Sequence, residues 1–160
     1  MRFGKPSEIA PADKAAFIDF VSAAGEVDRA ILPGLVEGAV VLVMHFDGDT
    51  LIGTAAIKTP YPAHRQGEFA KANASGEADA FPLELGWVVV RAEYRKRGLA
   101  PELVRAAVDL TTGQGIYATT KTPRMLTILR ECGFTVLGDS YASVLNPEAR
   151  LTLLVRRAGG

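Results

Sequence analysis

The residues that decide the fold are 83–110, which read LELGWVVVRAEYRKRGLAPELVRAAVDL. Residues 85–90 are a short, nearly continuous apolar run with three valines, which predicts a strand buried on both faces. A basic turn follows at residues 95–100. Residues 101–110 then carry apolar side chains at helical spacing, and the leading proline suits a first helical position, where a backbone N–H would be unpaired. The stretch therefore predicts a strand, a basic turn and a helix.

The basic turn has the properties of an anion site. Backbone N–H groups point outward where a helix begins, and together with the helix dipole they favour a negative charge such as a phosphate. Gly98 allows a strained backbone angle and the close approach of a ligand, and the small Ala100 does part of the same. Arg95, Lys96 and Arg97 add positive charge. The turn therefore indicates a pyrophosphate cradle, with a solvated basic loop as the alternative, and it lacks the Gly-Lys-Ser/Thr signature of a Walker loop.

Length and composition narrow the class of protein. A chain of 160 residues predicts a single domain over residues 1–160. The net charge of +0 argues against a general polyanion-binding surface. Cys132 is the single cysteine, so a disulfide framework is excluded and a reducing compartment is favoured. No apolar run approaches about 18 residues, so we expect no membrane span and a cytoplasmic protein.

Two segments resemble motifs of one family. The sequence RKRGLA at residues 95–100 resembles the Gln/Arg-x-x-Gly-x-Gly/Ala motif of the Gcn5-related N-acetyltransferase (GNAT) family. Residues 90–95, VRAEYR, are similar to that family's Val-x-Pro-Glu-Tyr-Arg, with alanine in place of proline. Residues 122–134, TPRMLTILRECGF, resemble its Asn-x-x-Ala-x-x-Leu-Tyr-x-x-x-Gly-Phe helix. The motifs occur in the order and at the spacing that the family shows.

The resemblance implies an α/β (α+β) fold, in which helices cover both faces of a mixed, mostly antiparallel central sheet. Patterning along the chain predicts about seven strands in that sheet. The expected strands are residues 2–5, 40–46, 50–57, 85–90, 115–119, 141–145 and 151–155. The expected helices are residues 11–24, 26–38 (interrupted by Pro33 and Gly34), 101–110 and 123–132.

Residues 59–81 are the least patterned part of the chain. They contain several prolines and glycines and few large apolar residues, and residues 68–72 predict at most one helical turn. A connection of this length is usually functional or partly disordered. We therefore expect the segment to border the substrate site, or to cross between the subunits of a homodimer.

The resemblance also implies which residues bind the cofactor, acetyl-coenzyme A. In the family the loop backbone binds the pyrophosphate, and the thioester lies along the central strand, where a backbone N–H polarises its carbonyl. Thr122 replaces the usual asparagine and retains a hydroxyl for a pantetheine amide. The expected cofactor-binding residues are Val88, Val89, Val90, Arg95, Lys96, Arg97, Gly98, Leu99, Ala100 and Thr122.

Two residues are the preferred catalytic candidates. Glu84 lies eleven residues before Arg95, an offset at which some family members carry a glutamate base. The alternative for Glu84 is an exposed carboxylate at the end of a strand. The family's tyrosine acid corresponds to Leu129, which cannot donate a proton. Tyr141 is the preferred substitute, with Tyr117 or a water molecule as alternatives.

The expected function is an acetyl-CoA-dependent N-acetyltransferase that transfers the acetyl group directly in a ternary complex. A small-molecule amine or amino acid, a peptide N-terminus and a lysine side chain are all open as acceptors, and a nucleic acid is disfavoured. We expect no metal site, because His45 and His64 lack a cysteine or carboxylate pattern. Trp87 is expected in the core or as a wall of the acceptor pocket.

Two functions of other classes compete with this one. Leu129 in the tyrosine position favours a non-catalytic acyl-CoA-binding sensor or subunit of a complex. A nucleic-acid-binding protein would use Arg91, Arg95, Lys96 and Arg97, and would bind with a steep dependence on salt. Thiol release with a panel of amines separates the first alternative from an enzyme.

Overall fold

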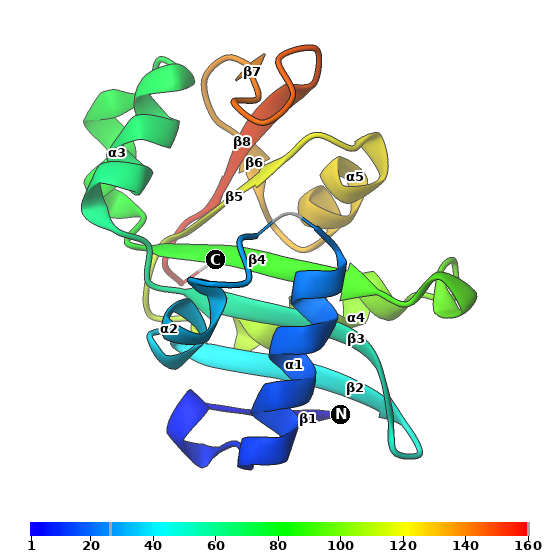
Figure 1. The fold of residues 1–160 in the computed structure, drawn as a ribbon. Helices are drawn as coiled ribbons and strands as arrows, with labels where there is room; N and C mark the ends of the chain where they lie inside the picture. The colour runs from blue at the N-terminus through cyan, green and yellow to red at the C-terminus, as the bar shows by residue number, and fades with distance from the viewer. Residues whose placement is uncertain (26, 160) are drawn as a thin grey trace. The chain divides into compact units, whose positions relative to one another are not determined.

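A computed structural model describes residues 1–25 and 27–159. Its strands are β1 (Arg2–Gly4), β2 (Val41–Asp47), β3 (Thr50–Lys58), β4 (Leu83–Val90), β5 (Ile116–Thr120), β6 (Thr135–Val136), β7 (Tyr141–Ala142) and β8 (Arg150–Arg156). Its α-helices are α1 (Pro11–Ala23), α2 (Leu32–Glu37), α3 (Pro62–Lys71), α4 (Leu99–Asp109) and α5 (Pro123–Glu131). Short 3₁₀ helices are η1 (Pro6–Glu8), η2 (Ser75–Ala80) and η3 (Ala92–Tyr94). Figure 1 labels the strands and α-helices and colours the chain from the N-terminus to the C-terminus.

The strands form one mixed sheet in the order β1-β2-β3-β4-β5-β8-β6, with β7 also paired to β8. The pairs β1–β2, β2–β3, β5–β8, β6–β8 and β7–β8 are antiparallel. The first residues of β4 pair in parallel with β5, with Leu83 opposite Ile116 and Glu84 opposite Tyr117. The expected α/β fold with a mostly antiparallel sheet is therefore confirmed, with eight strands in the described part of the chain.

The chain divides into two compact units. Unit 1 comprises Met1–Thr59 and Leu85–Thr111, and unit 2 comprises Pro60–Glu84 and Thr112–Gly160. The strand β4 therefore begins in unit 2 and ends in unit 1. Each unit has its own hydrophobic cluster.

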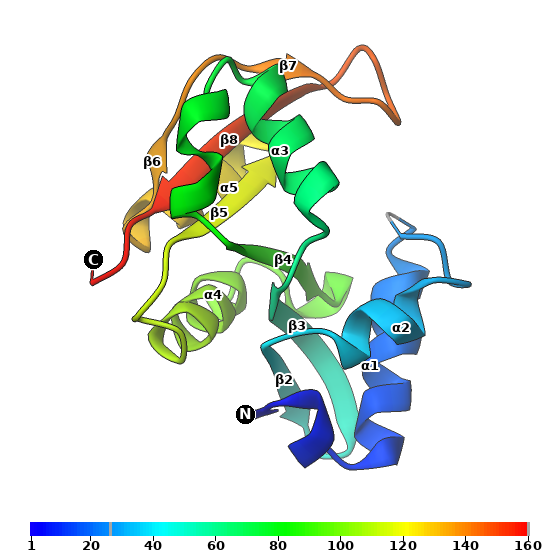
Figure 2. The ribbon, with the colours of Figure 1, turned by 90° about the vertical axis from the view of Figure 1, so that its left-hand side faces the viewer.

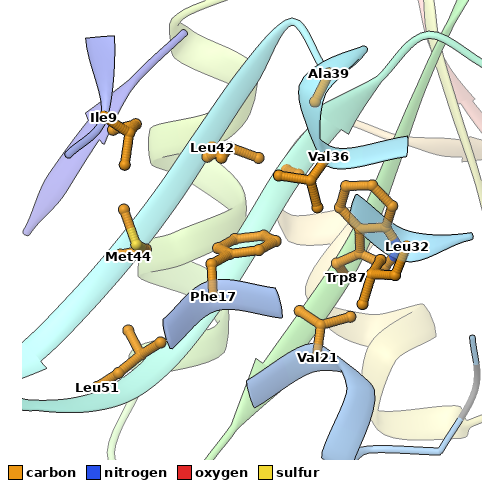
Figure 3. Close-up of a cluster of buried hydrophobic side chains, with 11 residues drawn as sticks. Ile9, Phe17, Val21, Leu32, Val36, Ala39, Leu42, Met44, Leu51 and Trp87 are labelled. Carbon is orange, nitrogen blue, oxygen red and sulfur yellow. The ribbon is translucent and has the colours of Figure 1, made fainter. Parts of the chain in front are cut away.

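In unit 1, helices cover both faces of β2 and β3. Figure 2 shows α1 and α2 on one face and α4 on the other. Phe17 of α1 points into a cluster with Leu42, Met44 and Trp87, which Figure 3 shows with its neighbours. On the other face α4 lies close to Gly53, where an added Cβ would come within 2.8 Å of Leu103 Cδ1. Glycine at this position therefore allows the helix to approach the strand.

In unit 2, α3 and α5 lie on opposite sides of β5 and β8 (Figures 1 and 2). Aromatic rings join α3 to the sheet. Phe69 meets Tyr117 edge-on with ring centroids 5.3 Å apart, and it stacks on Phe81 at 5.9 Å. Leu153 and Val155 of β8 complete this cluster. These contacts fix α3 against β5, the strand that pairs with the start of β4.

The prediction of at most one helical turn in residues 59–81 is wrong. The segment contains the ten-residue helix α3 and the 3₁₀ helix η2. Pro62 occupies the first turn of α3, where proline favours a helix rather than breaking it. Phe69 is the one large apolar side chain that α3 buries, so a repeating apolar pattern could not form.

Two predictions around the central strand also need correction. The strand is not buried on both faces along its length, because Gly86 and residues 88–90 are half-buried. The following helix begins at Leu99 rather than at Pro101, since Gly98 forms its N-terminal boundary. The backbone angle of Gly98 therefore sets the start of the helix.

Three further differences concern short elements. The second helix begins only at Leu32, because residues 27–31 form bends and turns, and Glu26 lies outside the described residues. The helix runs through Pro33 and Gly34 without interruption, because the proline lies in its first turn. The strand expected at residues 141–145 ends at Ala142; Ser143 is still buried, whereas Val144 and Leu145 are exposed. The two residues of β6 were missed because a strand of that length shows no alternation.

Candidate active site

The turn that begins α4 has the backbone geometry of an anion cradle. Gly98 adopts a left-handed conformation with φ of +80°, and Lys96 also has a positive φ, of +62°. No atom lies within 4 Å of a Cβ built on Gly98, so the backbone angle and not crowding favours glycine here. Arg95, Lys96 and Arg97 are exposed, and Leu99 and Ala100 are half-buried. The first-turn N–H groups of α4, which lack acceptors inside the helix, thus directly follow three exposed cationic residues in the chain.

Side-chain contacts hold the segment that leads into this turn to the β2–β3 hairpin. The Arg91 guanidinium donates from Nε and Nη2 to the carbonyl of Leu51, at 3.2 and 3.1 Å. The Tyr94 hydroxyl donates to Asp47 Oδ2, and the Arg97 guanidinium lies 5.2 Å from the Tyr94 ring centroid. The hydrogen bond to Asp47 raises the pKa of Tyr94 above its ordinary value. These contacts restrict how far the turn can move away from the sheet.

The middle of β4 departs from regular strand geometry at Trp87. Its φ is +52°, an uncommon angle for a bulky residue and one that marks strain. The Thr54 hydroxyl donates to the Trp87 carbonyl at 2.8 Å inside the protein, and the indole meets Phe17 edge-on at 6.0 Å. Trp87 is therefore a core residue, as one of the two sequence-based readings expected. Irregularities of this kind re-aim the backbone groups that follow, which here belong to Val88 and Val89.

Lys58, at the end of β3, lies against the same part of β4. Its ammonium nitrogen is 5.1 Å from the Trp87 ring centroid. A Cβ added to Gly86 would come within 2.5 Å of Lys58 Cε. Glycine at position 86 therefore leaves the space that the lysine side chain occupies.

Glu84 is buried in unit 2. Its exposed fraction is 8%, so the alternative of an exposed strand-end carboxylate is wrong. The Tyr117 hydroxyl donates to Glu84 Oε2 at 3.2 Å, as the parallel register of β4 and β5 places the two residues opposite each other. His64 Nε2 lies 3.7 Å from the same oxygen. Burial and the neighbouring Glu84 raise the pKa of Tyr117, which therefore keeps its proton.

Tyr141 forms a second pair of this kind in unit 2. Its hydroxyl donates to Glu68 Oε2, and the Lys71 ammonium lies 3.4 Å from Glu68 Oε1. Both Tyr141 and Glu68 are buried. Burial and the hydrogen bond to Glu68 raise the pKa of Tyr141. The amino-acid pattern does not indicate Glu68 as a site residue, because its four-residue spacing from His64 has meaning only once the helix α3 is known.

A backbone clamp joins the end of α3 to the segment before β7. The N–H of Asp139 donates to the carbonyl of Ala72 at 2.9 Å, and Asn73 Nδ2 donates to Asp139 Oδ2 at 2.9 Å. Gly138 has a φ of +69°, and an added Cβ would lie 2.0 Å from the Ala72 carbonyl oxygen. The clamp thus fixes the two segments that carry Glu68 and Tyr141.

The second motif helix, α5, begins as its sequence predicts. The Thr122 hydroxyl accepts the N–H of Met125 at 3.3 Å, and Pro123 opens the helix. Leu129 and Cys132 are buried, so the position of the family tyrosine is a core position here. Over residues 1–25 and 27–159, no group of three or more His, Cys, Asp or Glu side chains could hold a metal ion. In the same residues no helix is long and apolar enough to cross a membrane.

Comparisons with known proteins give one consistent result. The family model of the acetyltransferase (GNAT) family matches residues 15–134. An acyl-CoA N-acyltransferase from Pseudomonas aeruginosa has a similar structure, with 14% identity, 97% of each chain covered and a TM-score of 0.67. No curated protein matches the sequence significantly.

Two further solved structures were determined with a cofactor. An aminoglycoside 6'-N-acetyltransferase complexed with coenzyme A has 14% identity and a TM-score of 0.65, over 99% of this chain and 97% of that one. Arabidopsis thaliana NAA60 in complex with acetyl-CoA has 17% identity and a TM-score of 0.67, over 98% of both chains. At these identities the likeness establishes the fold.

Proposed function

This chain belongs to the acetyltransferase (GNAT) family, and from that premise we propose that it transfers an acetyl group from acetyl-CoA directly to a primary amine in a ternary complex. Family membership supports the coarser reaction, acyl transfer from coenzyme A to an amine. The observation that carries the proposal is the turn at residues 95–100, where Gly98 opens a helix among three cations.

Acetyl-CoA is proposed to bind through the chain's own backbone. The N–H groups of residues 95–100 bind the diphosphate, and Arg95, Lys96 and Arg97 neutralise its charge. A backbone N–H of residues 88–90 polarises the thioester carbonyl and stabilises the oxyanion that forms during transfer. The strained backbone at Trp87 supports this role, because it changes the direction of the groups that follow. Thr122 hydrogen-bonds the pantetheine arm.

Glu84 is proposed as the base. Its burial and its hydrogen bond from Tyr117 hold the carboxylate in one orientation, which a positioned base requires. Tyr141 is proposed as the acid that protonates the leaving thiolate. Its hydroxyl donates to Glu68, so it must turn from Glu68 toward the sulfur during the reaction. Tyr117 and a water molecule are the alternatives for this step.

The acceptor is proposed to be a small-molecule amine, an amino acid, a peptide N-terminus or a protein lysine. The named functions of two structural relatives correspond to the first two of these acceptors, since one is an aminoglycoside acetyltransferase and another is an N-acyl amino acid synthase. We also propose that residues 1–160 form one domain and that the protein is cytoplasmic. Both a monomer and a homodimer are compatible with this proposal. The neutral net charge disfavours a nucleic-acid partner. It equally disfavours the interpretation of the basic turn as a nucleic-acid site.

A non-catalytic acyl-CoA-binding sensor is the second candidate, and buried Leu129 in the tyrosine position favours it. Thiol release from acetyl-CoA, measured with a panel of amines and checked by mass spectrometry of the acetylated product, separates the two. Longer acyl-CoA donors in the same assay test acetyl preference. An enzyme releases thiol in step with product. Tight coenzyme A binding without release under any amine would establish the sensor instead.

A further inference from the structure

Acetylation of a protonated amine releases one proton to solvent, and a buried base cannot deliver that proton to solvent by itself. A primary amine near neutral pH is mostly an ammonium ion, since the pKa of a lysine-type amine is about 10.4. The reaction of an ammonium with a thioester yields an amide, a thiol and one proton. One amine proton ends on the sulfur, and the other must reach solvent. Glu84, the proposed base, is only 8% exposed.

An exposed titratable group, His64, lies beside that carboxylate in the described part of the chain. His64 Nε2 lies 3.7 Å from Glu84 Oε2, and the His64 side chain is 50% exposed. The histidine occupies the first turn of α3, which aromatic contacts hold against β5. The remaining distance exceeds a hydrogen bond of about 3.2 Å, so a small rotation of the exposed ring or one water molecule closes it.

Several other groups near this carboxylate do not combine solvent exposure with a proton that they can release near neutral pH. Tyr117 donates to the same oxygen, but it is fully buried and its raised pKa retains its proton. Glu68 and Tyr141 are buried and paired with each other. Arg65 is permanently charged and pairs with Asp79 at 3.4 Å. Histidine is also the side chain whose ordinary pKa suits transfer near neutral pH.

We propose that His64 is the proton exit of the acyltransferase: it receives from Glu84 the proton that the acceptor ammonium gives up, and it releases a proton to solvent. The inference rests on the proposed function. In the first step an ammonium N–H bond breaks and the proton binds Glu84. That proton then moves to Nε2 of neutral His64, while the proton on Nδ1 leaves to solvent. The second amine proton replaces the one that Tyr141 gives to the thiolate, so charge and atoms balance. His64 acts through Glu84 and does not touch the substrate.

The test compares His64→Gln with the matched variant His45→Gln, which changes the other histidine of the chain. Two acceptors are used, an alkylamine that binds as the ammonium and an arylamine that is already neutral. With the alkylamine, His64→Gln should lower kcat at least about tenfold, since acid–base groups contribute roughly 10²–10⁴-fold. Added imidazole should restore the rate. With the arylamine the variant should stay within about twofold of the parent, because no proton must leave before attack.

Two results would overturn the proposal. One is a kcat for His64→Gln that stays within about twofold of the parent with the alkylamine. The other is an equal loss with both amines that imidazole does not restore, which would indicate a structural role. His45→Gln should behave as the parent, and coenzyme A affinity, measured by calorimetry, should be unchanged in both variants.

A second measurement separates failure of this inference from failure of the proposed function. If the parent protein acetylates no amine, the proposed function fails, and the imidazole ¹⁵N signals still report on the pair. Replacing Glu84 with glutamine should shift the His64 signals and leave those of His45 in place. Unmoved His64 signals would show that the two groups do not interact. That result would contradict the proposed role of His64 whether or not the protein is an enzyme.

Discussion

The two units of the molecule differ in how their chemistry is encoded. In unit 1 the candidate cofactor loop consists of consecutive residues, 95–100, whose charge and backbone angles belong to one turn. In unit 2 the candidate acid–base groups come from four separate elements, and they meet only through the register of β4 on β5 and the packing of α3. A local site can be recognised from sequence, whereas a site built by tertiary contacts cannot.

The largest expected effect is on Glu84 in unit 2. The change Glu84→Gln keeps the size and a hydrogen-bond acceptor for Tyr117 but removes the base. We expect kcat to fall about 10²–10⁴-fold, with little change in coenzyme A affinity. Steady-state kinetics and calorimetry measure the two quantities. Full activity of the variant at every pH tested would remove Glu84 from the mechanism.

The next effect concerns the turn in unit 1. Gly98→Ala forces a Cβ into a left-handed backbone at a cost of about 1–2 kcal/mol, which corresponds to a loss of roughly 5–30-fold in coenzyme A affinity if binding needs this angle. Gly113→Ala is the matched control, because that glycine has open space around it and no positive φ. Equal affinities for the two variants would mean that the turn does not use its unusual angle to bind the cofactor.

A third prediction uses the alkaline stability of unit 2. The unfolded chain loses tyrosine protons near pH 10, whereas Tyr117 keeps its proton in the fold because burial and Glu84 raise its pKa. The stabilisation that the Tyr117 hydroxyl contributes is complete below pH 10. Above pH 10 the free energy of unfolding falls by about 1.4 kcal/mol per pH unit for each tyrosine whose pKa is raised in this way. Urea unfolding of Tyr117→Phe should therefore show a shallower loss above pH 10. Tyr61→Phe, at a 70% exposed position, should keep the parent slope; identical slopes for all three proteins would refute the assignment.

The smallest effect is expected at the anchor of the loop. Tyr94→Phe removes the hydroxyl that donates to Asp47 and leaves the ring under Arg97. We expect coenzyme A affinity to fall a few-fold, roughly the effect of one exposed hydrogen bond, with kcat unchanged. Calorimetry at matched ionic strength measures it. A loss as large as that of Gly98→Ala would show that the tether, and not the backbone angle, positions the turn.

The parts of the fold that sequence predicted share a physical origin. The two strands on either side of Gly48, the helix that opens at Pro123 and the strained angle at Gly98 each depend on local backbone preferences, and each occurs where expected. By contrast, α3 buries a single large apolar residue and begins with a proline, so its sequence resembles a loop. The same helix carries His64 and Glu68, and without the helix their contacts with Glu84 and Tyr141 could not be predicted.

Contacts between elements that are distant in the sequence could not be predicted either. Nothing in the sequence places Tyr117 rather than Tyr141 beside Glu84, because that choice follows from the parallel register of two strands. The positive φ of Trp87 was equally hidden, since its hydrogen bond from Thr54 and its packing on Phe17 stabilise a conformation that the residue itself disfavours.

Backbone amide signals of the turn test the central claim most directly. Acetyl-CoA is titrated into the ¹⁵N-labelled protein, and the N–H signals of residues 95–100 are followed by NMR. We expect these signals to shift and saturate together, and to do so at higher acetyl-CoA concentration in Gly98→Ala. If they stay in place while acetyl-CoA reaches millimolar concentration, the turn does not bind the diphosphate and the account is contradicted.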